Sequence, residues 1–234
     1  MIISRVPLPT PTPINVCIAH VTDLHNKPHP DLWRALLAEH PDMVLVSGDV
    51  VHSADAWERG IDFLHKCALR YFTCCSLGNH EFKYGADFRE RIRQTGAVLL
   101  DDSYIVKGSF VIGGLTTGFA QKAQGTLKRT PMPNVDWLDG FCEQKGYRIL
   151  LSHHPEYFDL LKERDVDLIL SGHAHGGQWR FFDIPVFSPG QGLFPRYTSG
   201  FYENKMFVSR GLANTALVPR FGNPPELVIL RGTK

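Results

Sequence analysis

The chain has 234 residues, with 25 Lys and Arg against 24 Asp and Glu, so its formal net charge is only +1. This balance excludes a general electrostatic attraction to nucleic acid or to an anionic membrane, and partners must be recognised by local sites. The length is enough to bury one sizeable core. We expect an extended, proline-rich lead-in at residues 1–13 and a single domain at residues 14–234, with folding beginning near Ile14.

Cysteine usage and hydropathy indicate the compartment. The five cysteines form an odd set without metal-type spacing: Cys17, Cys67, Cys74, Cys75 and Cys142. Three of them lie within expected strands, which favours buried, reduced thiols over disulfides. The N-terminus shows no apolar signal core, and no run approaches the ~20 apolar residues of a membrane helix. We therefore expect a cytoplasmic protein without a transmembrane segment; peripheral membrane contact stays open, and no oligomeric state is predicted.

The first half of the chain alternates strands and helices. Apolar runs predict strands at 16–21, 43–46 and 71–77, and helical spacing predicts helices at 30–39, from a cap at Ser53 or Asp55 to residue 69, and at 87–95. Short β elements are expected at 97–100, 104–106 and 110–115. The order is βαβαβα followed by meandering β structure.

The second half begins with a polar segment at 117–133, which we expect to be an irregular loop of the length typical of a lid or substrate wall. Helices are predicted at 136–144 and 157–163, with strands at 147–151, 166–170, 179–182, 205–209 and 227–230. A loop rich in Gly, Pro and Tyr should span 188–200. This pattern indicates an α/β fold in which two mixed sheets stack and helices cover them.

Five short strings rich in His, Asp and Asn each follow one of these apolar runs. They are Asp23-Leu24-His25, Gly48-Asp49, Gly78-Asn79-His80-Glu81, His153 and Gly172-His173-Ala174-His175. Ligands of open α/β folds collect where strands end, so these side chains should lie along one rim of a sheet. Nitrogen and oxygen donors of these types build polynuclear metal centres.

The spacing within the strings suits metal binding. Asp23 and His25 flank one residue, and because strand side chains alternate, both can face the same side. Asp49 follows a glycine that lets the backbone come close to a cation, and it is our candidate for a bridging ligand. Asn79 offers a neutral amide oxygen, which satisfies a divalent cation without adding negative charge. The last string repeats the one-residue spacing.

Each string alone has an ordinary explanation. Asp-x-His occurs by chance, Gly-Asp after a strand is commonly a turn, and Asn-His before a helix is commonly a cap. No turn type requires the two histidines of the last string, and the whole set in this order favours a functional site. Packing, surface or supporting roles are expected for His20, His29, His40, His65 and His154, whereas His52 stays ambiguous.

The order of the strings resembles the calcineurin-like metallophosphoesterase superfamily over residues 23–175. Segments 172–178, 192–200, 209–211 and 221–227 resemble its YkuE/YaeI-like bacterial phosphodiesterase branch. The resemblance implies a four-layer α/β/β/α sandwich of two mixed sheets flanked by helices. Purple acid phosphatases carry a Tyr ligand three residues after the bridging Asp, where this chain has His52, so that branch is disfavoured.

The resemblance also implies ligands for two divalent metal ions per chain. The first would be held by Asp23, His25, Asp49 and His175, the second by Asp49, Asn79, His153 and His173, and His80 would be a catalytic residue that does not ligate metal. His153 is preferred to its neighbour His154 because the ligand in such proteins closely follows the strand, with a Pro shortly after it, here Pro155. Nitrogen and oxygen ligands without thiolate suit Mn²⁺, which we favour, as well as Fe or Zn²⁺.

These features predict hydrolysis of a small-molecule phosphoester, most simply a phosphodiester, by a hydroxide that bridges two metals. Two cations ~3.5–4 Å apart can bind a shared water and lower its pKa from roughly 16 towards neutrality. A protonated His80 would stabilise the charge that builds on the phosphate or donate a proton to the leaving oxygen.

Alternatives stay open. Related enzymes suggest a pyrophosphatase of a UDP-sugar lipid, whose apolar cleft would include Phe119, Phe194 and Phe201. Some superfamily members have lost their metal site, so a catalytically silent interaction scaffold is the alternative from another class. Arg196 and Arg210 are candidates to grip a substrate phosphate, although ordinary salt bridges explain them equally well.

Overall fold

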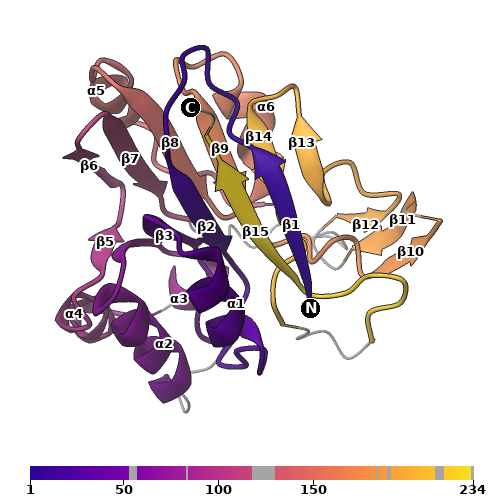
Figure 1. Cartoon of the computed structure of the whole chain (residues 1–234). Coiled ribbons are helices and arrows are strands. Elements are labelled where there is room, and N and C mark those ends of the chain that lie inside the picture. The colour runs from indigo at the N-terminus through magenta and orange to yellow at the C-terminus, as the bar shows by residue number, and fades with distance from the viewer. Residues whose placement is uncertain are drawn as a thin grey trace.

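The computed structural model describes residues 1–52, 57–82, 84–117, 130–182, 184–188, 191–213 and 219–232. Within these ranges two six-stranded sheets stack face to face, and helices pack on the outer face of each (Figure 1). The α/β class and the expected four-layer α/β/β/α sandwich are therefore confirmed. None of the helices in the described ranges is long and apolar enough to cross a membrane.

The first sheet has the strand order β1-β15-β2-β3-β4-β5. Its strands are β1 (Ile2–Pro7), β2 (Cys17–Val21), β3 (Met43–Ser47), β4 (Phe72–Ser76), β5 (Val98–Leu100) and β15 (Glu226–Arg231). Strands β2 to β5 run parallel, β15 is antiparallel to β2, and β1 pairs in parallel with β15. β3 is buried along its whole length, which explains its run of four apolar residues.

The second sheet has the order β13-β14-β9-β8-β7-β6. Its strands are β6 (Ser103–Lys107), β7 (Phe110–Leu115), β8 (Tyr147–Ser152), β9 (Leu168–Ser171), β13 (Gly200–Tyr202) and β14 (Met206–Val208). The four inner strands are parallel, and both edge strands are antiparallel to their neighbours. Side chains such as Ile18 and Leu45 meet Ile149 and Leu170 in the fully buried core between the sheets.

Helices α1 (Leu32–Glu39), α2 (Glu58–Ala68) and α4 (Ala86–Gln94) cover the first sheet, and α5 (Leu138–Cys142) and α6 (Phe158–Leu161) cover the second. Two short helical turns, α3 (Asn79–Phe82) and a 3₁₀ turn (Pro155–Tyr157), follow strands β4 and β8. α2 buries Gly60, Phe63, Leu64 and Cys67, which are the i, i+3, i+4 and i+7 positions of one helix face.

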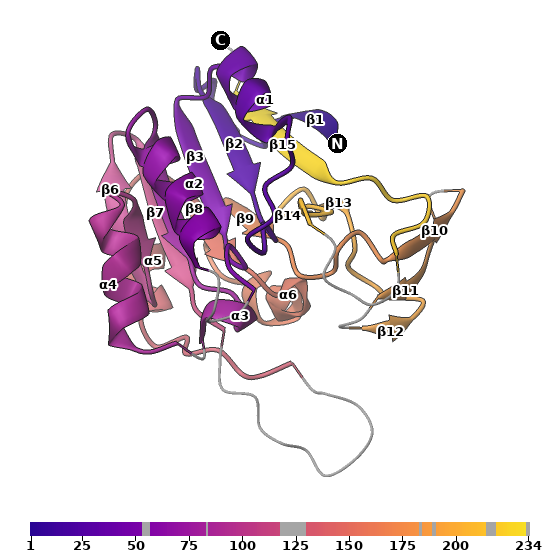
Figure 2. The ribbon, with the colours of Figure 1, turned by 90° about the horizontal axis from the view of Figure 1, so that it is seen from below.

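A third, smaller sheet consists of the antiparallel strands β10 (Trp179–Phe181), β11 (Ile184–Ser188) and β12 (Gly192–Leu193). Figure 2 shows it projecting from one end of the sandwich. Of these strands, the sequence predicted only β10. The expected loop at 188–200 is partly wrong, because β12 and the start of β13 fall within it. Both are two- or three-residue strands whose Gly-rich sequence gives no alternation to detect.

The start of the fold differs from expectation. Folding does not begin near Ile14, because β1 lies within the lead-in expected at residues 1–13 and pairs with β15 from Ile2 to Pro7. Pro7 ends the strand, so the proline-rich part begins only there. The division into a lead-in and one domain at 14–234 stays a prediction. Ser53 and Asp55, expected to cap α2, and residues 118–129 of the expected loop lie outside the described residues.

Candidate metal centre

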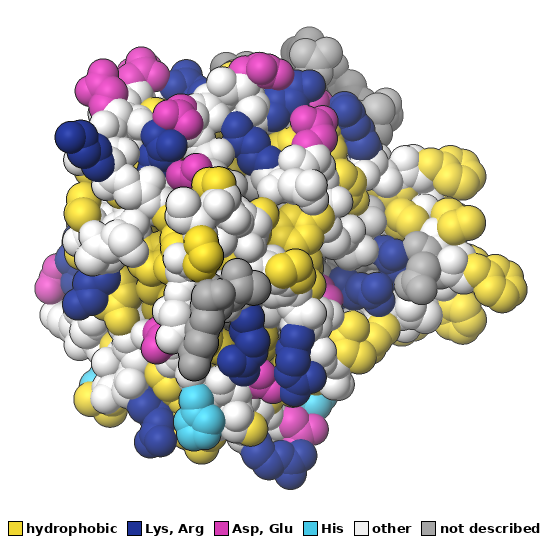
Figure 3. Space-filling view, turned by 45° about the horizontal axis from the view of Figure 1, so that its top comes forward, with side chains coloured by type: hydrophobic (Ala, Val, Ile, Leu, Met, Phe, Trp, Pro, Cys, Tyr) yellow, Lys and Arg dark blue, Asp and Glu magenta, His cyan; other side chains and the backbone are white. Residues whose placement is uncertain are grey.

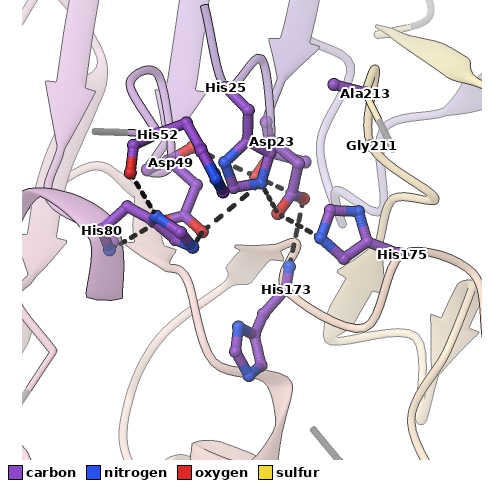
Figure 4. Close-up of polar contacts among 12 residues, drawn as sticks. Asp23, His25, Asp49, His52, His80, His173, His175, Gly211 and Ala213 are labelled. Atoms are coloured by element: carbon purple, nitrogen blue, oxygen red, sulfur yellow. Dashed lines mark hydrogen bonds and ion pairs between the residues drawn. The ribbon is translucent and has the colours of Figure 1, made fainter. Parts of the chain in front are cut away.

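The five strings meet at one end of the sandwich, and both sheets contribute to them. Asp23 follows β2, Asp49 follows β3 and Asn79 begins the turn after β4, all in the first sheet. His153 follows β8, and the string with two histidines follows β9, both in the second sheet. Figure 4 shows the side chains of Asp23, His25, Asp49, His80 and His175 pointing toward one another. The rim expected from the sequence is therefore built by two sheets rather than by one.

The first group of side chains combines Asp23, His25 and His175, whose potential ligand atoms lie within 4.8 Å of one another. The Nε2 atoms of His25 and His175 lie 3.7 and 3.6 Å from Oδ1 of Asp23. The other carboxylate oxygen, Oδ2, accepts hydrogen bonds of 3.1 Å from the His173 backbone N–H and from the Thr22 hydroxyl. Asp23 is thus anchored through Oδ2 and turns Oδ1 toward the two imidazoles.

The second group combines Asp49, His153 and His173, again with potential ligand atoms within 4.8 Å of one another. Oδ2 of Asp49 lies 3.2 Å from Nε2 of His153 and 3.6 Å from Nε2 of His25, which belongs to the first group. The Nδ1–H of His153 donates to the Ser47 carbonyl at 2.8 Å, and this bond turns Nε2 toward Asp49. Asp49 therefore lies between the two groups.

His80 lies at the more open side of the site, where its side chain is 24% exposed. Its backbone N–H donates to Oδ1 of Asp49 at 3.0 Å, and its Nδ1–H donates to the His52 carbonyl at 2.9 Å. Nε2 of His80 is 3.9 Å from Oδ2 of Asp49. The His52 ring stacks on the His80 ring at 4.8 Å between centroids, and with His25 the two rings form a third group of potential ligand atoms (Figure 4). The structure thus brings the ambiguous His52 to the site.

The backbone of the site is strained. Asp23, His25, Asp49, His173 and His175 all have positive φ angles, between 47° and 64°. Non-glycine residues rarely adopt this left-handed conformation, and each such residue costs roughly 1–3 kcal/mol unless its surroundings enforce it. Neighbouring glycines allow the close packing: a Cβ on Gly78 would lie 2.2 Å from Oδ1 of Asp49. Such a concentration of strained residues is typical of functional sites.

Three supporting side chains were given no role by the sequence. Glu81 is buried and accepts hydrogen bonds from the backbone N–H groups of Asp49, Val51 and Gly78 at 2.8, 2.9 and 2.8 Å. These bonds fix the loops that carry Asp49 and Asn79. On the opposite side, Nη2 of Arg220 lies 3.1 Å from Nδ1 of His175, and Nδ2 of Asn223 donates to the His175 carbonyl at 2.6 Å. Arg220 directly precedes the segment 221–227, and Asn223 lies within it. The resemblance of this segment to the YkuE/YaeI-like branch was the only sequence signal near either residue.

Burial and mutual charge shift the pKa values of the site. Burial alone would raise the pKa values of Asp23 and Asp49, but the imidazoles of His175 and His153, respectively, hold them well below the usual range. Burial lowers the pKa of His175 to about 4 and that of His173 to about 3.

His153 behaves differently. Burial works to lower its pKa, but Asp49 overcomes this effect and raises the value to about 10. Burial, and then the charge of Asp49, also raise the pKa of Glu81 to about 7. Both shifts indicate that negative charge is concentrated around Asp49. A bound cation would relieve this concentration of charge.

Buried atoms without a hydrogen-bond partner indicate whether a cation fits the site. Within the described ranges, five buried atoms of the expected ligands have no hydrogen-bond partner: Oδ1 of Asp23, Nδ1 and Nε2 of His25, Oδ1 of Asn79 and Nε2 of His153. Buried polar atoms are nearly always paired, because an unsatisfied one costs about 1–3 kcal/mol. Carboxylate and amide oxygens with imidazole nitrogens are a typical donor set for divalent transition metals. The residues present therefore fit the metal ions expected from the sequence.

Several other residues singled out from the sequence are not members of the three groups of potential ligand atoms. Nδ1 of His154 lies 3.1 Å from the Thr117 hydroxyl, and its ring packs on His173 at 4.1 Å between centroids. Arg196 forms an ion pair of 2.9 Å with Asp159. Phe194 and Phe201 were expected to line an apolar cleft. Phe194 is instead exposed, and Phe201 packs on Phe207 of the inter-sheet core. Phe119 lies outside the described residues.

Comparisons with known proteins agree with this arrangement. The model of the calcineurin-like phosphoesterase family matches residues 17–177. The uncharacterized metallophosphoesterase YkuE of Bacillus subtilis is 28% identical over 206 residues, which cover 81% of this chain and 67% of YkuE. The phosphodiesterase YaeI of Escherichia coli is 27% identical over 218 residues, which cover 83% of this chain and 71% of YaeI.

A shorter match involves the UDP-2,3-diacylglucosamine pyrophosphatase LpxG of Chlamydia muridarum. It is 33% identical over 93 residues, which cover 36% of this chain and 28% of LpxG. The chain spans between 50% and 67% of the length of YkuE and of the matched metallophosphoesterases from Helicobacter pylori and Campylobacter jejuni.

Proposed function

Because the chain belongs to the calcineurin-like phosphoesterase family, we propose that it is a hydrolase that cleaves phosphoesters with the help of two divalent metal ions. One observation carries the proposal: two groups of buried carboxylate and imidazole side chains converge at the strand ends, and several of their donor atoms have no protein partner in the described ranges. A folded protein retains such a costly arrangement when a ligand completes it.

We assign the ligands as the sequence suggested. One cation would be held by Asp23, His25, Asp49 and His175, and the other by Asp49, Asn79, His153 and His173. The shared role of Asp49 is supported by its Oδ2 atom, which lies within 4 Å of imidazoles from both groups. Asn79 is supported by its buried, unpaired Oδ1 atom.

When bound, a pair of divalent cations would neutralise phosphoryl oxygens and lower the pKa of water, so that hydroxide is available to attack phosphorus near neutral pH. The chain's own contribution beyond holding them would come from His80. Its Nδ1–H is fixed on the His52 carbonyl, so its Nε2 atom faces the site from the more open side. From there a protonated His80 would stabilise charge on the phosphate or give a proton to the leaving oxygen.

We propose a small-molecule phosphodiester as the substrate class, since the phosphodiesterase YaeI matches most of the chain. The second candidate is the pyrophosphate bond of a nucleotide-sugar lipid. It is favoured by one observation: exposed aromatic and aliphatic side chains gather on the small sheet, directly after the loop that carries His173 and His175. We place the reaction in the cytoplasm, where the five free thiols would stay reduced.

The test begins with metal analysis of the purified protein, followed by reconstitution with Mn²⁺, Fe²⁺ or Zn²⁺. We expect close to two metal ions per chain and metal-stimulated hydrolysis of bis(p-nitrophenyl) phosphate, with Mn²⁺ the most active. Hydrolysis of UDP-2,3-diacylglucosamine in place of the chromogenic diester would favour the second candidate. Substoichiometric metal together with no hydrolysis of any phosphoester would reject the proposal in favour of a silent scaffold.

A further inference from the structure

A third group of imidazoles lies on the more open side of the proposed metal centre. We call it the outer triad: His25, His52 and His80, whose potential ligand atoms lie within 4.8 Å of one another. The centroid of the His80 ring lies 4.8 Å from that of His25 and 4.8 Å from that of His52. Zinc–nitrogen bonds of ~2.0–2.1 Å place tetrahedral ligand atoms about 3.4 Å apart, so small rotations of the two outer rings would bring the three nitrogens into range.

Asp49 places negative charge beside the outer triad. Its Oδ2 atom lies 3.6 Å from Nε2 of His25 and 3.9 Å from Nε2 of His80. Three imidazoles with a nearby carboxylate are a typical donor set for Zn²⁺ and Co²⁺. His25 is fully buried, and in the described ranges neither of its ring nitrogens has a hydrogen-bond partner. A buried imidazole of this kind is costly unless an ion completes it.

The exposure of the side chains arranges the groups in order from solvent to core. The first group is buried throughout, whereas the outer triad combines the buried His25 with the partly exposed His80 and the exposed His52. Of the three groups found in the described ranges, only the outer triad has an exposed member. His173 of the second group is partly exposed, but its ring packs on that of His154. Because His25 belongs both to the outer triad and to the first group, donors follow one another from solvent into the buried centre.

The distribution of surface charge leaves capture of a cation to local donors. On the face drawn in Figure 3, acidic and basic side chains of the described residues are interspersed. The formal net charge of the whole chain is only +1. A long-range field that gathers cations needs one sign of charge to predominate. Cations should therefore be captured by ligand atoms close to the opening of the site.

We infer that the outer triad is an entry site, which captures divalent cations such as Zn²⁺ or Co²⁺ and passes them through His25 to the first group. Its occupancy is transient. Once both ions of the proposed centre are in place, their charge repels a further cation and Asp49 is engaged between them, so His80 is released. The inference rests on the two-metal centre proposed above and adds the route by which it is filled and a role for His52.

The test measures metal uptake and not hydrolysis. Protein is freed of metal with a chelator, and uptake of Co²⁺ is followed by stopped-flow visible absorbance. Release is followed by transfer of bound Co²⁺ to a chromogenic chelator, and titration calorimetry gives the dissociation constants and the number of ions per chain.

The variants isolate the donor atoms of His52. His52→Phe keeps a ring of similar shape to stack on His80 and removes the nitrogens, whereas His52→Glu puts a ligand atom back. Both keep the backbone carbonyl that accepts the His80 Nδ1–H. The matched control is His65→Phe, which replaces an exposed imidazole of α2 whose Nδ1 atom lies 3.1 Å from the Thr95 carbonyl.

We expect His52→Phe to slow uptake by at least about tenfold, because an ion held at the outer triad moves on in an intramolecular step. Release should slow by the same factor, since entry and exit share one route. The dissociation constants and the two ions per chain should then stay as in wild type. His52→Glu should recover most of the lost rate, and His65→Phe should behave as wild type.

Three results would overturn the inference: uptake by His52→Phe as fast as by wild type, an equal loss of rate in His52→Glu, or a weakened affinity without slower uptake. A third ion retained at saturation would also contradict it, because the outer triad would then be a permanent site. Wild-type protein that takes up two ions through His52 but cleaves no phosphoester would refute only the proposed function. Hydrolysis with unchanged uptake by His52→Phe would refute only the entry site.

Discussion

Glu81 is the side chain whose removal should damage the site most without touching a proposed ligand. Its carboxylate accepts three backbone N–H groups, those of Asp49, Val51 and Gly78, and it is buried. Glu81→Ala leaves three buried donors unpaired at about 1–3 kcal/mol each, or about 3–9 kcal/mol in total. This loss is comparable with the whole stability of a typical domain, about 5–15 kcal/mol. Glu81→Gln keeps two of the three bonds if its amide oxygen replaces Oε2, and it also removes the charge repulsion with Asp49 that helps raise the pKa of Glu81, so its loss of stability should stay below about 3 kcal/mol.

The measurement is urea unfolding of chelator-treated protein at pH 8, above the raised pKa of Glu81 of about 7, so that the carboxylate is ionised. Glu90→Ala serves as the control, because Glu90 lies on α4 in an exposed pair with Arg93 and its loss should change stability by less than about 0.5 kcal/mol. The expected order of stability is wild type and Glu90→Ala, then Glu81→Gln, then Glu81→Ala. If Glu81→Ala unfolds within about 1 kcal/mol of wild type, the account of Glu81 as the anchor of these loops is wrong.

Three further predictions concern single side chains. His80→Ala should lower turnover by roughly 10²–10⁴-fold at saturating metal while metal content, measured by elemental analysis, stays the same; an unchanged rate contradicts the proton-donor role. Asp49→Asn should lose metal, and retention of two ions per chain excludes Asp49 as the bridge. Hydrogen bonding by Arg5, and then by Arg231, lowers the pKa of Glu39, so this pairing stabilises the fold fully above the unfolded pKa of about 4.3 and is lost as pH falls through the lower folded value. The stability difference between wild type and Glu39→Gln should therefore shrink in acid unfolding, and a constant difference from pH 7 to pH 3 rules out the pairing.

The strands that carry the site could be predicted because their sequences are locally unambiguous. β3 and β9 are buried on both faces and read as unbroken apolar runs, so their polar ends were visible in the sequence. β1 could not be found in the same way. Its exposure varies along its length, and it becomes a strand only by pairing with β15, more than 200 residues later in the chain.

The residues of the site likewise divide into those that could be predicted from the sequence and those that could not. The residues proposed as ligands stand at strand ends in recognisable strings, so residue type and order were enough to select them. Glu81 was visible in its string, but its role depends on N–H groups from Asp49 and Val51, about 30 residues away. Arg220 reaches His175 across 45 residues from a segment without regular structure. Contacts of this kind depend on the packing of loops, which no local pattern encodes.

The arrangement of the two groups has a consequence for biosynthesis. Each group draws on both sheets: Asp23 and His25 meet His175, and Asp49 meets His153 and His173. A growing chain that has left the ribosome only as far as Asn79 therefore presents Asp23, His25 and Asp49 without the imidazoles of His153, His173 and His175. Neither group can form until β9 has emerged and the halves have closed on each other. We expect metal acquisition to be one of the last events in maturation, and a truncated product to be unable to retain the ions.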